Sequence, residues 1–245
     1  MGTLSRRAQR ARALHDRKAR HTAGLFLVEG DHQVAEAQAA GLQIVEAFVT
    51  EGHAGPDGCP VEVVPERVLR LLAETESPQG IVAVVEMPAA SPPPRPGLQL
   101  LLDGVADPGN LGAVLRVAVA FGAVACVLGP GCVDPWNGKA LRAAAGATFR
   151  LVPEEVADLA AECRALAGYA VYGLVPRGGT PLPAVPLPVR TAFVLGNEAH
   201  GISPAVLALV QPVTIPMAGA VESLNAATAI SVPAYLWSQA QQHKP

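Results

Sequence analysis

Hydrophobic residues follow two alternating patterns along the first third of the chain. Short runs rich in Val, Ile, Leu and Phe predict β-strands, because these residues favour extended, half-buried backbone. Between the runs, apolar residues recur three and four positions apart, the spacing of one helix face. Strands are predicted at 26–30, 44–50, 61–64 and 81–86, with helices at 31–41 and 65–75. The alternation predicts a small α/β domain.

The same alternation continues in the rest of the chain. Residues 98–105 form a near-continuous apolar run, typical of a parallel strand that is covered on both faces. Further strands are predicted at 124–129, 148–152, 169–175, 191–196 and 212–217, and helices at 111–122, from Lys139, at 154–168 and at about 223–241. Pro233 predicts a kink in the last helix. Residues 176–190 predict an irregular loop, long enough to indicate a function.

A proline-rich segment marks the domain boundary. Five of the ten residues 88–97 are Pro, which fixes φ, lacks an N–H and favours an extended spacer. We therefore expect a domain over 1–87, a linker over 88–97 and a second domain over 98–245. At 50% hydrophobic and 16% charged, the 245 residues exclude a disordered chain. Neither a signal peptide nor a transmembrane helix is expected.

Charge is distributed unevenly. Residues 1–21 hold seven basic residues and one acidic residue, whereas the remainder holds eleven basic and twenty acidic residues. A basic segment on an acidic body indicates contact with a polyanion, most plausibly nucleic acid. The alternative is a helix whose arginines are simply solvated. Charge alone does not decide between the two readings. The basic residues are Arg6, Arg7, Arg10, Arg12, Arg17, Lys18 and Arg20.

The four cysteines indicate neither a metal site nor a disulfide framework. Cys59, Cys126, Cys132 and Cys163 form no CxxC pair and have no histidine-rich neighbours. We expect reduced thiols in a cytoplasmic protein without a metal.

Candidate chemistry lies in three loops that each follow an apolar strand. The sequence holds no GxGxxG, P-loop, HExxH or GxSxG motif. In the first loop, 103–123, Asn110 occupies a predicted helix N-cap. Arg116 is the one cation on a helix face of small residues, where a phosphate can approach the guanidinium closely. The alternative for Arg116 is an ordinary surface arginine.

The other two loops combine glycines with polar residues. In 193–203, Gly196 and Gly201 bracket Asn197, Glu198 and His200, and these glycines permit close backbone approach to a ligand. Ser203 before Pro204 predicts an ordinary helix cap. In 213–230, Ser223 and Asn225 lie at a helix start, where backbone groups are free to bind a ligand. Taken singly, these two residues are explained as a cap and its neighbour.

Together the three loops resemble the signature motifs of the SpoU (TrmH-type) branch of the SPOUT RNA 2′-O-ribose methyltransferases. The matching segments are LDGVADPGNLGAVLRVAVAFGA, FVLGNEAHGIS and IPMAGAVESLNAATA, in the family's order. The resemblance covers about 98–240. Residues 13–87 resemble the family's N-terminal RNA-binding domain of ribosomal-protein-L30e type. RAAAG at 142–146 departs from the family by having Ala where relatives often carry Ser.

The resemblance implies an α/β fold: an N-terminal L30e-like domain and a C-terminal SPOUT domain with a deep trefoil knot. It implies S-adenosylmethionine held by loops near 195–202 and 215–225, largely through backbone groups. The implied catalytic residues are Arg116, Asn110, Glu198, Ser223 and Asn225. The implied cofactor residues are Leu174, Leu195, Gly196, Asn197, Gly201, Ile215, Met217, Leu224 and Asn225.

The resemblance also implies an assembly and a substrate. The family works as a homodimer, in which Arg116 of one subunit reaches the other's pocket. The last helix, with Ala226, Ala227, Ile230, Tyr235 and Trp237, is a candidate dimer surface. The expected reaction methylates a ribose 2′-hydroxyl in RNA, with 23S rRNA favoured over tRNA. The alternatives are an inactive RNA-binding adaptor, which intact Arg116, Glu198 and Asn225 oppose, and a nucleotide-dependent oxidoreductase.

Overall fold

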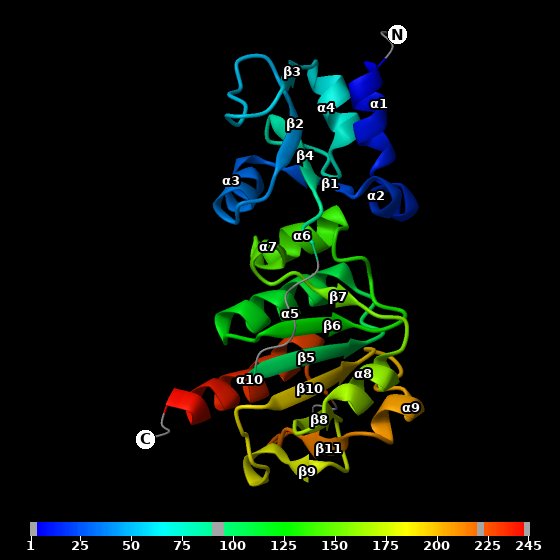
Figure 1. The fold of residues 1–245 in the computed structure, drawn as a ribbon, viewed down its shortest axis with the longest axis vertical. Coiled ribbons are helices and arrows are strands. Elements are labelled where there is room, and N and C mark those ends of the chain that lie inside the picture. The colour runs from blue at the N-terminus through cyan, green and yellow to red at the C-terminus, as the bar shows by residue number, and fades with distance from the viewer. Residues whose placement is uncertain (1–3, 90–95, 220–222, 243–245) are drawn as a thin grey trace. The chain divides into compact units, whose positions relative to one another are not determined.

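The chain forms two compact units, each with its own sheet (Figure 1). The computed structural model describes residues 4–89, 96–219 and 223–242. The N-terminal unit comprises Met1–Ala89 together with Asp134–Arg150, and the C-terminal unit comprises Ala90–Val133 together with Leu151–Pro245. Residues 90–95 of the predicted linker lie outside the described residues. Among the described residues, every helix is too short or too polar to traverse a lipid bilayer.

The sheet of the N-terminal unit follows the predicted strands closely. Its order is β1-β4-β2-β3, with antiparallel β1–β4 and β4–β2 pairs and a parallel β2–β3 pair. The strands are β1 (Leu25–Glu29), β2 (Ile44–Val49), β3 (Val61–Val63) and β4 (Ile81–Glu86), and the predicted helices are α3 (Asp31–Ala39) and α4 (Glu66–Leu72). Every residue from Ile81 to Val85 is buried, which explains the clear apolar signal of β4.

The basic N-terminal segment folds into two short helices, α1 (Arg6–Ala13) and α2 (Arg17–Ala23). One face of α1 is apolar: Ala8 and Ala11 are buried in a cluster with Phe48 and Leu69. The opposite face carries arginines into solvent. The segment is therefore an integral part of the N-terminal core as well as a basic surface.

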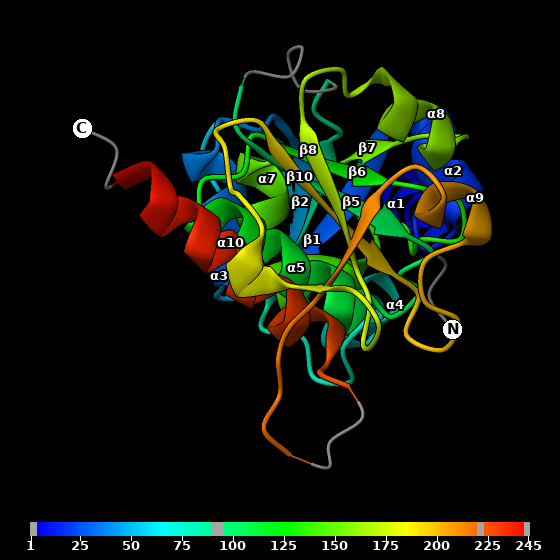
Figure 2. The same ribbon diagram turned by 90° about the horizontal axis from the view of Figure 1, so that it is seen from below.

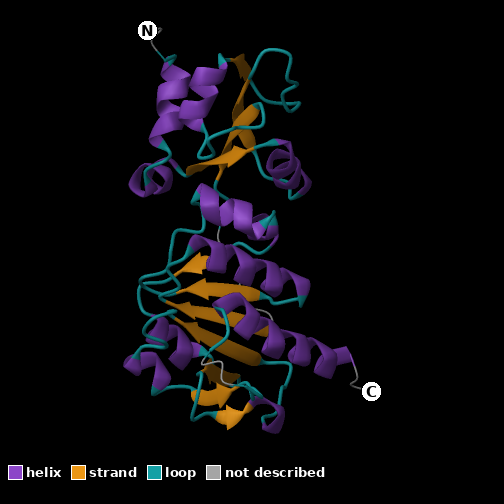
Figure 3. Ribbon diagram, turned by 180° about the vertical axis from the view of Figure 1, so that it is seen from behind, coloured by secondary structure: helices purple, strands orange, loops and turns teal. Residues whose placement is uncertain are grey.

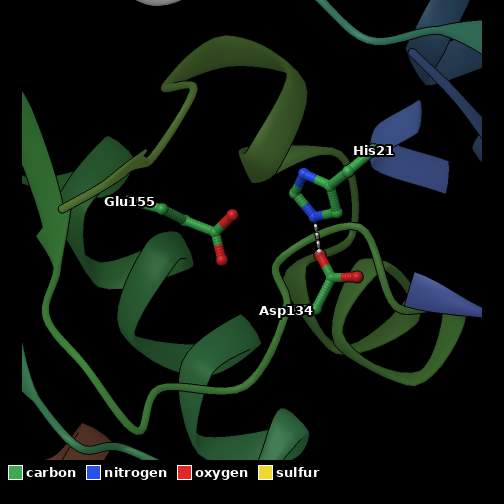
Figure 4. Close-up of side chains that lie close together, drawn as sticks. All are labelled: His21, Asp134 and Glu155. Atoms are coloured by element: carbon green, nitrogen blue, oxygen red, sulfur yellow. Dashed lines mark ion pairs between the residues drawn. The ribbon is translucent and has the colours of Figure 1, made fainter. Parts of the chain in front are cut away.

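Arg20 departs from the predicted basic surface, because it is buried. Its guanidinium pairs with Asp134, which is likewise about 5% exposed, through Nε and Nη2. Its Nη1 donates to the carbonyl oxygens of Leu14 and His15 at 2.7 and 2.8 Å. His21 Nε2 lies 3.7 Å from the other Asp134 oxygen (Figure 4). Each guanidinium nitrogen of Arg20 donates to a protein acceptor, so Arg20 is a structural residue here and not an exposed RNA contact.

Residues 134–150 pack on the N-terminal sheet through aromatic and charged contacts. They form α6 (Gly138–Ala144) and α7 (Ala147–Arg150). The Phe26 ring lies 4.7 Å from that of Trp136 and 5.9 Å from that of Phe149. Arg150 pairs with Glu36 at 2.6 Å. The strand predicted at 148–152 is therefore wrong: burial of Thr148 and Phe149 against this sheet selects a helical turn instead.

The C-terminal unit is built on a seven-stranded sheet, ordered β7-β6-β5-β10-β8-β11-β9, in which every described pairing is parallel. The strands are β5 (Leu98–Asp103), β6 (Ala125–Leu128), β7 (Glu154–Glu155), β8 (Ala170–Leu174), β9 (Thr180–Pro181), β10 (Thr191–Gly196) and β11 (Gln211–Thr214). Leu98 and Leu100–Leu102 of β5 are fully buried, as predicted for a strand covered on both faces.

Helices cover both faces of this sheet. α5 (Pro108–Ala120) and α10 (Ala226–Gln242) lie on one face, where they pack together, and α8 (Leu159–Ala165) and α9 (Pro204–Leu207) lie on the other (Figures 1 and 3). α8 begins later than predicted, because Glu154–Glu155 pair with β6 and Asp158 caps the helix. α10 continues through Pro233. The loop predicted at 176–190 contains β9 and a short 3-10 turn at Leu182–Ala184.

β8 lies between β10 and β11 in the sheet, although it precedes both in the chain. This order agrees with the predicted trefoil knot, which stays a prediction.

The buried side of α10 corrects one expectation. Ala226, Ile230 and Trp237 are buried in their own unit, and Trp237 Nε1 donates to the Pro188 carbonyl at 2.9 Å. These three residues cannot supply dimer surface. Tyr235 is 49% exposed and remains available on the outer side of the helix.

Candidate active site

The three motif loops meet at one edge of the C-terminal sheet. β10 pairs in parallel with both β5 and β8, and β8 pairs in parallel with β11. β5, β10 and β11 therefore all point the same way, and the loops that follow them emerge at the same edge of the sheet (Figure 2). The sheet thereby gathers segments about a hundred residues apart in sequence.

Asp107, and not Asn110, caps the helix of the first motif. α5 begins at Pro108, and Asp107 Oδ1 accepts from the Asn110 backbone N–H at 2.8 Å. The N-cap predicted for Asn110 is therefore wrong. Asn110 lies in the first turn instead, where its side-chain amide is free to reach the other motifs.

Asn110 joins the three motifs through two side-chain hydrogen bonds. Asn225 Nδ2 donates to Asn110 Oδ1 at 2.8 Å, and Asn110 Nδ2 donates to Glu198 Oε1 at 2.7 Å. Asn225 Oδ1 in turn accepts from the Ala227 N–H at the start of α10, at 3.0 Å. The helix start thus fixes the Asn225 amide, which orients Asn110, which orients the carboxylate.

Glu198 is the last residue of this series of hydrogen bonds, and only one of its two carboxylate oxygens accepts from Asn110. Its side chain is exposed, and no described residue hydrogen-bonds its second carboxylate oxygen. An oriented, solvent-accessible carboxylate oxygen is an acceptor for a hydroxyl or amine of a ligand.

The second motif is a closed turn, and the backbone and side chain of its Asn197 are used to stabilise it. Asn197 and Gly201 exchange backbone hydrogen bonds at 3.0 and 2.8 Å, and Asn197 Nδ2 donates to the Gly104 carbonyl at 2.7 Å. A Cβ on Gly196 would lie 2.2 Å from the Gly201 carbonyl carbon. Gly196 is therefore required by turn closure, and the Asn197 side chain is engaged within the protein.

The predicted cap position of Ser203 is confirmed, because Ser203 is the N-cap of α9, which begins at Pro204. The side chain of Ser203 makes no capping hydrogen bond; its backbone N–H donates to Asp103 Oδ2 at 2.7 Å. Asp103, at the end of β5, thus fastens the second motif to the first, a role that the sequence pattern does not reveal.

Two predicted catalytic residues stand apart from this cluster. Arg116 and Ser223 are exposed, and neither forms a hydrogen bond or ion pair with a described residue. Arg116 lies six residues beyond Asn110 on α5, which places it about 9 Å further along the axis and on another side of the helix.

Three of the predicted cofactor residues combine apolar side chains with backbone groups that no described hydrogen bond engages. Ile215, Met217 and Leu224 are half-buried, and none of the described hydrogen bonds engages them. Leu174 is half-buried at the end of β8. Such loops suit a flat aromatic ring held by backbone donors and acceptors, as S-adenosylmethionine requires. Leu195 differs, because at 6% exposure its side chain belongs to the core.

Burial makes two of the four thiols poor nucleophiles. All four cysteines are free, and burial raises the pKa of both Cys126 and Cys132, which keeps these thiols protonated at neutral pH.

The predicted RNA-binding residues divide into two groups. Arg7 is held by Glu46 and lies over the Phe48 ring, and Arg20 is buried with Asp134. The others are exposed on α1 and α2; they are Arg6, Arg10, Arg12, Arg17 and Lys18.

Comparison with known proteins decides the family. The sequence pattern described as "SpoU rRNA Methylase family" matches residues 97–235, and that of the "MRM3-like substrate binding domain" matches residues 6–83. The chain belongs to the SpoU rRNA methylase family. The predicted family is thereby confirmed, and with it the predicted class of enzyme, an RNA methyltransferase.

Relatives of this SpoU protein match along most of their length. The 23S rRNA (guanosine(2553)-2′-O)-methyltransferase RlmP of Bacillus subtilis is 36% identical over 91% of this chain and 92% of its own. A 23S rRNA (uridine(2479)-2′-O)-methyltransferase of Streptomyces viridochromogenes is 33% identical over 71% of this chain and 65% of its own.

Solved structures agree in fold. A putative RNA methyltransferase of the TrmH family from Porphyromonas gingivalis superposes with a TM-score of 0.85 at 33% identity, covering 98% of this chain and 100% of its own. The SpoU methyltransferase AviRb from Streptomyces viridochromogenes, described in complex with the cofactor AdoMet, superposes with a TM-score of 0.86 at 28% identity, covering 99% and 100%.

Proposed function

We propose that this SpoU-family protein transfers a methyl group from S-adenosylmethionine to a ribose 2′-hydroxyl of 23S rRNA. The observation that carries the proposal is the hydrogen-bonded chain Asn225–Asn110–Glu198, which holds one residue from each motif at a single sheet edge. The relatives named for 23S rRNA 2′-O-methylation, at 36% and 33% identity, support the substrate.

S-adenosylmethionine supplies an activated methyl group when bound. The residues that would hold it follow β10 and β11: the turn opened by Gly196, and Ile215, Met217 and Leu224 with their unpaired backbone groups. The complex of AviRb with AdoMet supports this choice of cofactor. The closed turn keeps one wall of the pocket in place before the ligand arrives.

The reaction needs an oriented hydroxyl more than a strong base. A ribose 2′-hydroxyl is a weak nucleophile, and positioning it in line with the methyl group supplies much of the acceleration. Glu198 offers an oriented carboxylate oxygen to a polar group of the bound ligands, while Asn110 and Asn225 keep that oxygen in place. Ser223 is exposed at the edge of the same motif and is proposed as a further polar contact.

Arg116 is proposed to act across a homodimer. A guanidinium is a cation with five N–H donors, so its role is to bind phosphate and to stabilise the negative charge that develops on the hydroxyl oxygen. Because it lies on another side of α5 from Asn110, it is exposed away from its own hydrogen-bonded chain. In a homodimer it would complete the pocket of the second copy.

The protein is proposed to act in the cytoplasm, where its proposed substrate is located. The relatives named for 23S rRNA come from bacteria, in which ribosomes assemble in the cytoplasm.

Mapping of the methylated nucleotide tests the proposed function. The purified full chain is incubated with labelled S-adenosylmethionine and either a 23S rRNA transcript or bulk tRNA, and 2′-O-methyl positions are mapped. We expect label in 23S rRNA at one ribose. Label in tRNA alone would favour the tRNA alternative, and cofactor binding without transfer to either RNA would favour the inactive adaptor.

Exposed arginines of α1 are expected to strengthen RNA binding by neutralising phosphates. Arg6 and Arg10 lie four residues apart, on one side of the helix. In Arg6→Ala/Arg10→Ala, the slope of log K against log salt should flatten by about 0.7–0.9 for each phosphate that is no longer neutralised. The measurement is RNA affinity at four salt concentrations, with Arg164→Ala/Arg190→Ala as the charge-matched control. Equal slopes in the two variants would show that the α1 arginines are merely solvated.

A further inference from the structure

Cations are scarce on the C-terminal unit, and their places in the fold differ. The described residues of this unit include four basic side chains, Arg116, Arg164, Arg177 and Arg190. Arg164 and Arg190 precede β8 and β10, so both lie toward the amino ends of these parallel strands. Arg177 follows the carboxyl end of β8. It therefore lies at the edge where the three motif loops emerge.

The loop that carries Arg177 is fastened to β11 on both sides. Before it, the Val175 N–H donates to the Val213 carbonyl at 2.9 Å. After it, the Gly179 N–H donates to Thr214 Oγ1 at 2.9 Å. A Cβ on Gly179 would lie 2.8 Å from the Val213 Cα, which shows how closely the loop follows the strand. Three residues, 176–178, are thus held between two fixed points.

The Arg177 side chain has no partner in the part of the chain that the structure describes. It is exposed, and it forms neither a hydrogen bond nor an ion pair with any described residue. β11 continues directly into Ile215, where the third motif begins, so the loop that carries Arg177 is fastened next to the start of that motif. An exposed cation on a fastened loop, which pairs with no described carboxylate, is suited to a phosphate group.

We propose that Arg177 binds a backbone phosphate of the RNA substrate beside the target nucleotide. The inference rests on the proposed function and adds a positioning residue to it. Arg177 holds the RNA strand in position, while Arg116 acts at the reacting hydroxyl. A phosphate fits better than the cofactor's carboxylate, because Arg177 is exposed whereas the cofactor residues Ile215, Met217 and Leu224 are half-buried.

The test compares Arg177→Ala with Arg190→Ala, which removes another exposed cation, at the opposite edge of the sheet. For Arg177→Ala we expect KM for the 23S rRNA transcript to rise about tenfold, the effect of removing one charge-assisted hydrogen bond to phosphate. The slope of log K against log salt should flatten by about 0.7–0.9. The Kd for S-adenosylmethionine should stay within about twofold of the parent value, measured by calorimetry without RNA. Arg177→Lys should recover part of the RNA affinity.

Two results would overturn the proposal. One is an Arg177→Ala variant that matches Arg190→Ala in KM and salt slope, which would leave Arg177 as a solvated residue. The other is a raised Kd for S-adenosylmethionine with unchanged RNA affinity, which would assign Arg177 to the cofactor's carboxylate. Failure of the proposed function is distinguishable, because the parent protein itself would then fail to methylate the transcript.

Discussion

Replacing Arg116 by Ala is expected to lower the rate of methyl transfer by about 100- to 1,000-fold, the effect of removing a group that stabilises developing negative charge. Binding of S-adenosylmethionine and folding should both be unaffected. The reason is that the side chain is exposed and makes no hydrogen bond or ion pair within the described part of the subunit. Single-turnover rates at saturating RNA and cofactor give the measurement, and Arg164→Ala is the matched control. Near-parent turnover in Arg116→Ala would remove Arg116 from the mechanism.

Mixed dimers show in which subunit Arg116 acts. Arg116→Ala and Asn110→Ala are each expected to be inactive when pure. If Arg116 serves the partner's pocket, a mixed dimer contains one complete site, and random mixing restores about a quarter of the parent activity. If Arg116 serves its own pocket, or if the protein is a monomer, no mixed species contains a complete site and the mixture stays inactive. The second outcome would contradict the proposed homodimeric site.

Replacing Arg20 by Ala is expected to lower the free energy of unfolding by about 3–5 kcal/mol, because the buried Asp134 carboxylate would lose the cation that pairs with it most closely. Asp134 would keep its carboxylate with both oxygens almost completely buried. The carbonyl oxygens of Leu14 and His15, which end α1 and lead into α2, would also lose their donor. Urea unfolding followed by circular dichroism gives the measurement.

Two further variants separate the ion pair from general damage. Arg12→Ala removes an exposed cation from α1 and should change the free energy of unfolding by less than about 0.5 kcal/mol. The double variant Arg20→Met/Asp134→Leu leaves no unpaired charge and should recover most of the stability. A double variant no more stable than Arg20→Ala would show that the packing of Arg20, and not its charge, stabilises the unit.

The sequence pattern predicts those elements whose signal is local. β4 and β10 match their predicted ranges because each is a continuous apolar run buried on both faces. The three motif loops are recognisable because glycine and polar residues follow such strands. The pattern assigns Asn110 the wrong role, since Asp107 three residues earlier satisfies the same pattern and only the structure shows which side chain reaches the N–H.

Contacts between distant residues account for most of what the sequence does not reveal. The sequence predicts that Arg20 is one more surface arginine. The structure shows instead that it is buried and pairs with Asp134, which lies 114 residues away in the sequence. The helical turn at Ala147–Arg150 is selected by Phe26, a residue of the first strand. Arg177 lies in a loop whose length indicates a function, but its importance follows from the strand order, which puts β8 next to β11.

The membership of residues 134–150 in the N-terminal unit bears on how this unit can be exchanged between relatives. A chimera cut at the proline-rich segment would join one parent's Phe26, Glu29 and Glu36 to the other parent's Trp136, Arg142 and Arg150. Such a graft breaks an aromatic cluster and two charge pairs at once. A graft that keeps the N-terminal unit whole must exchange two separate stretches of gene, one ending near codon 89 and one covering codons 134–150.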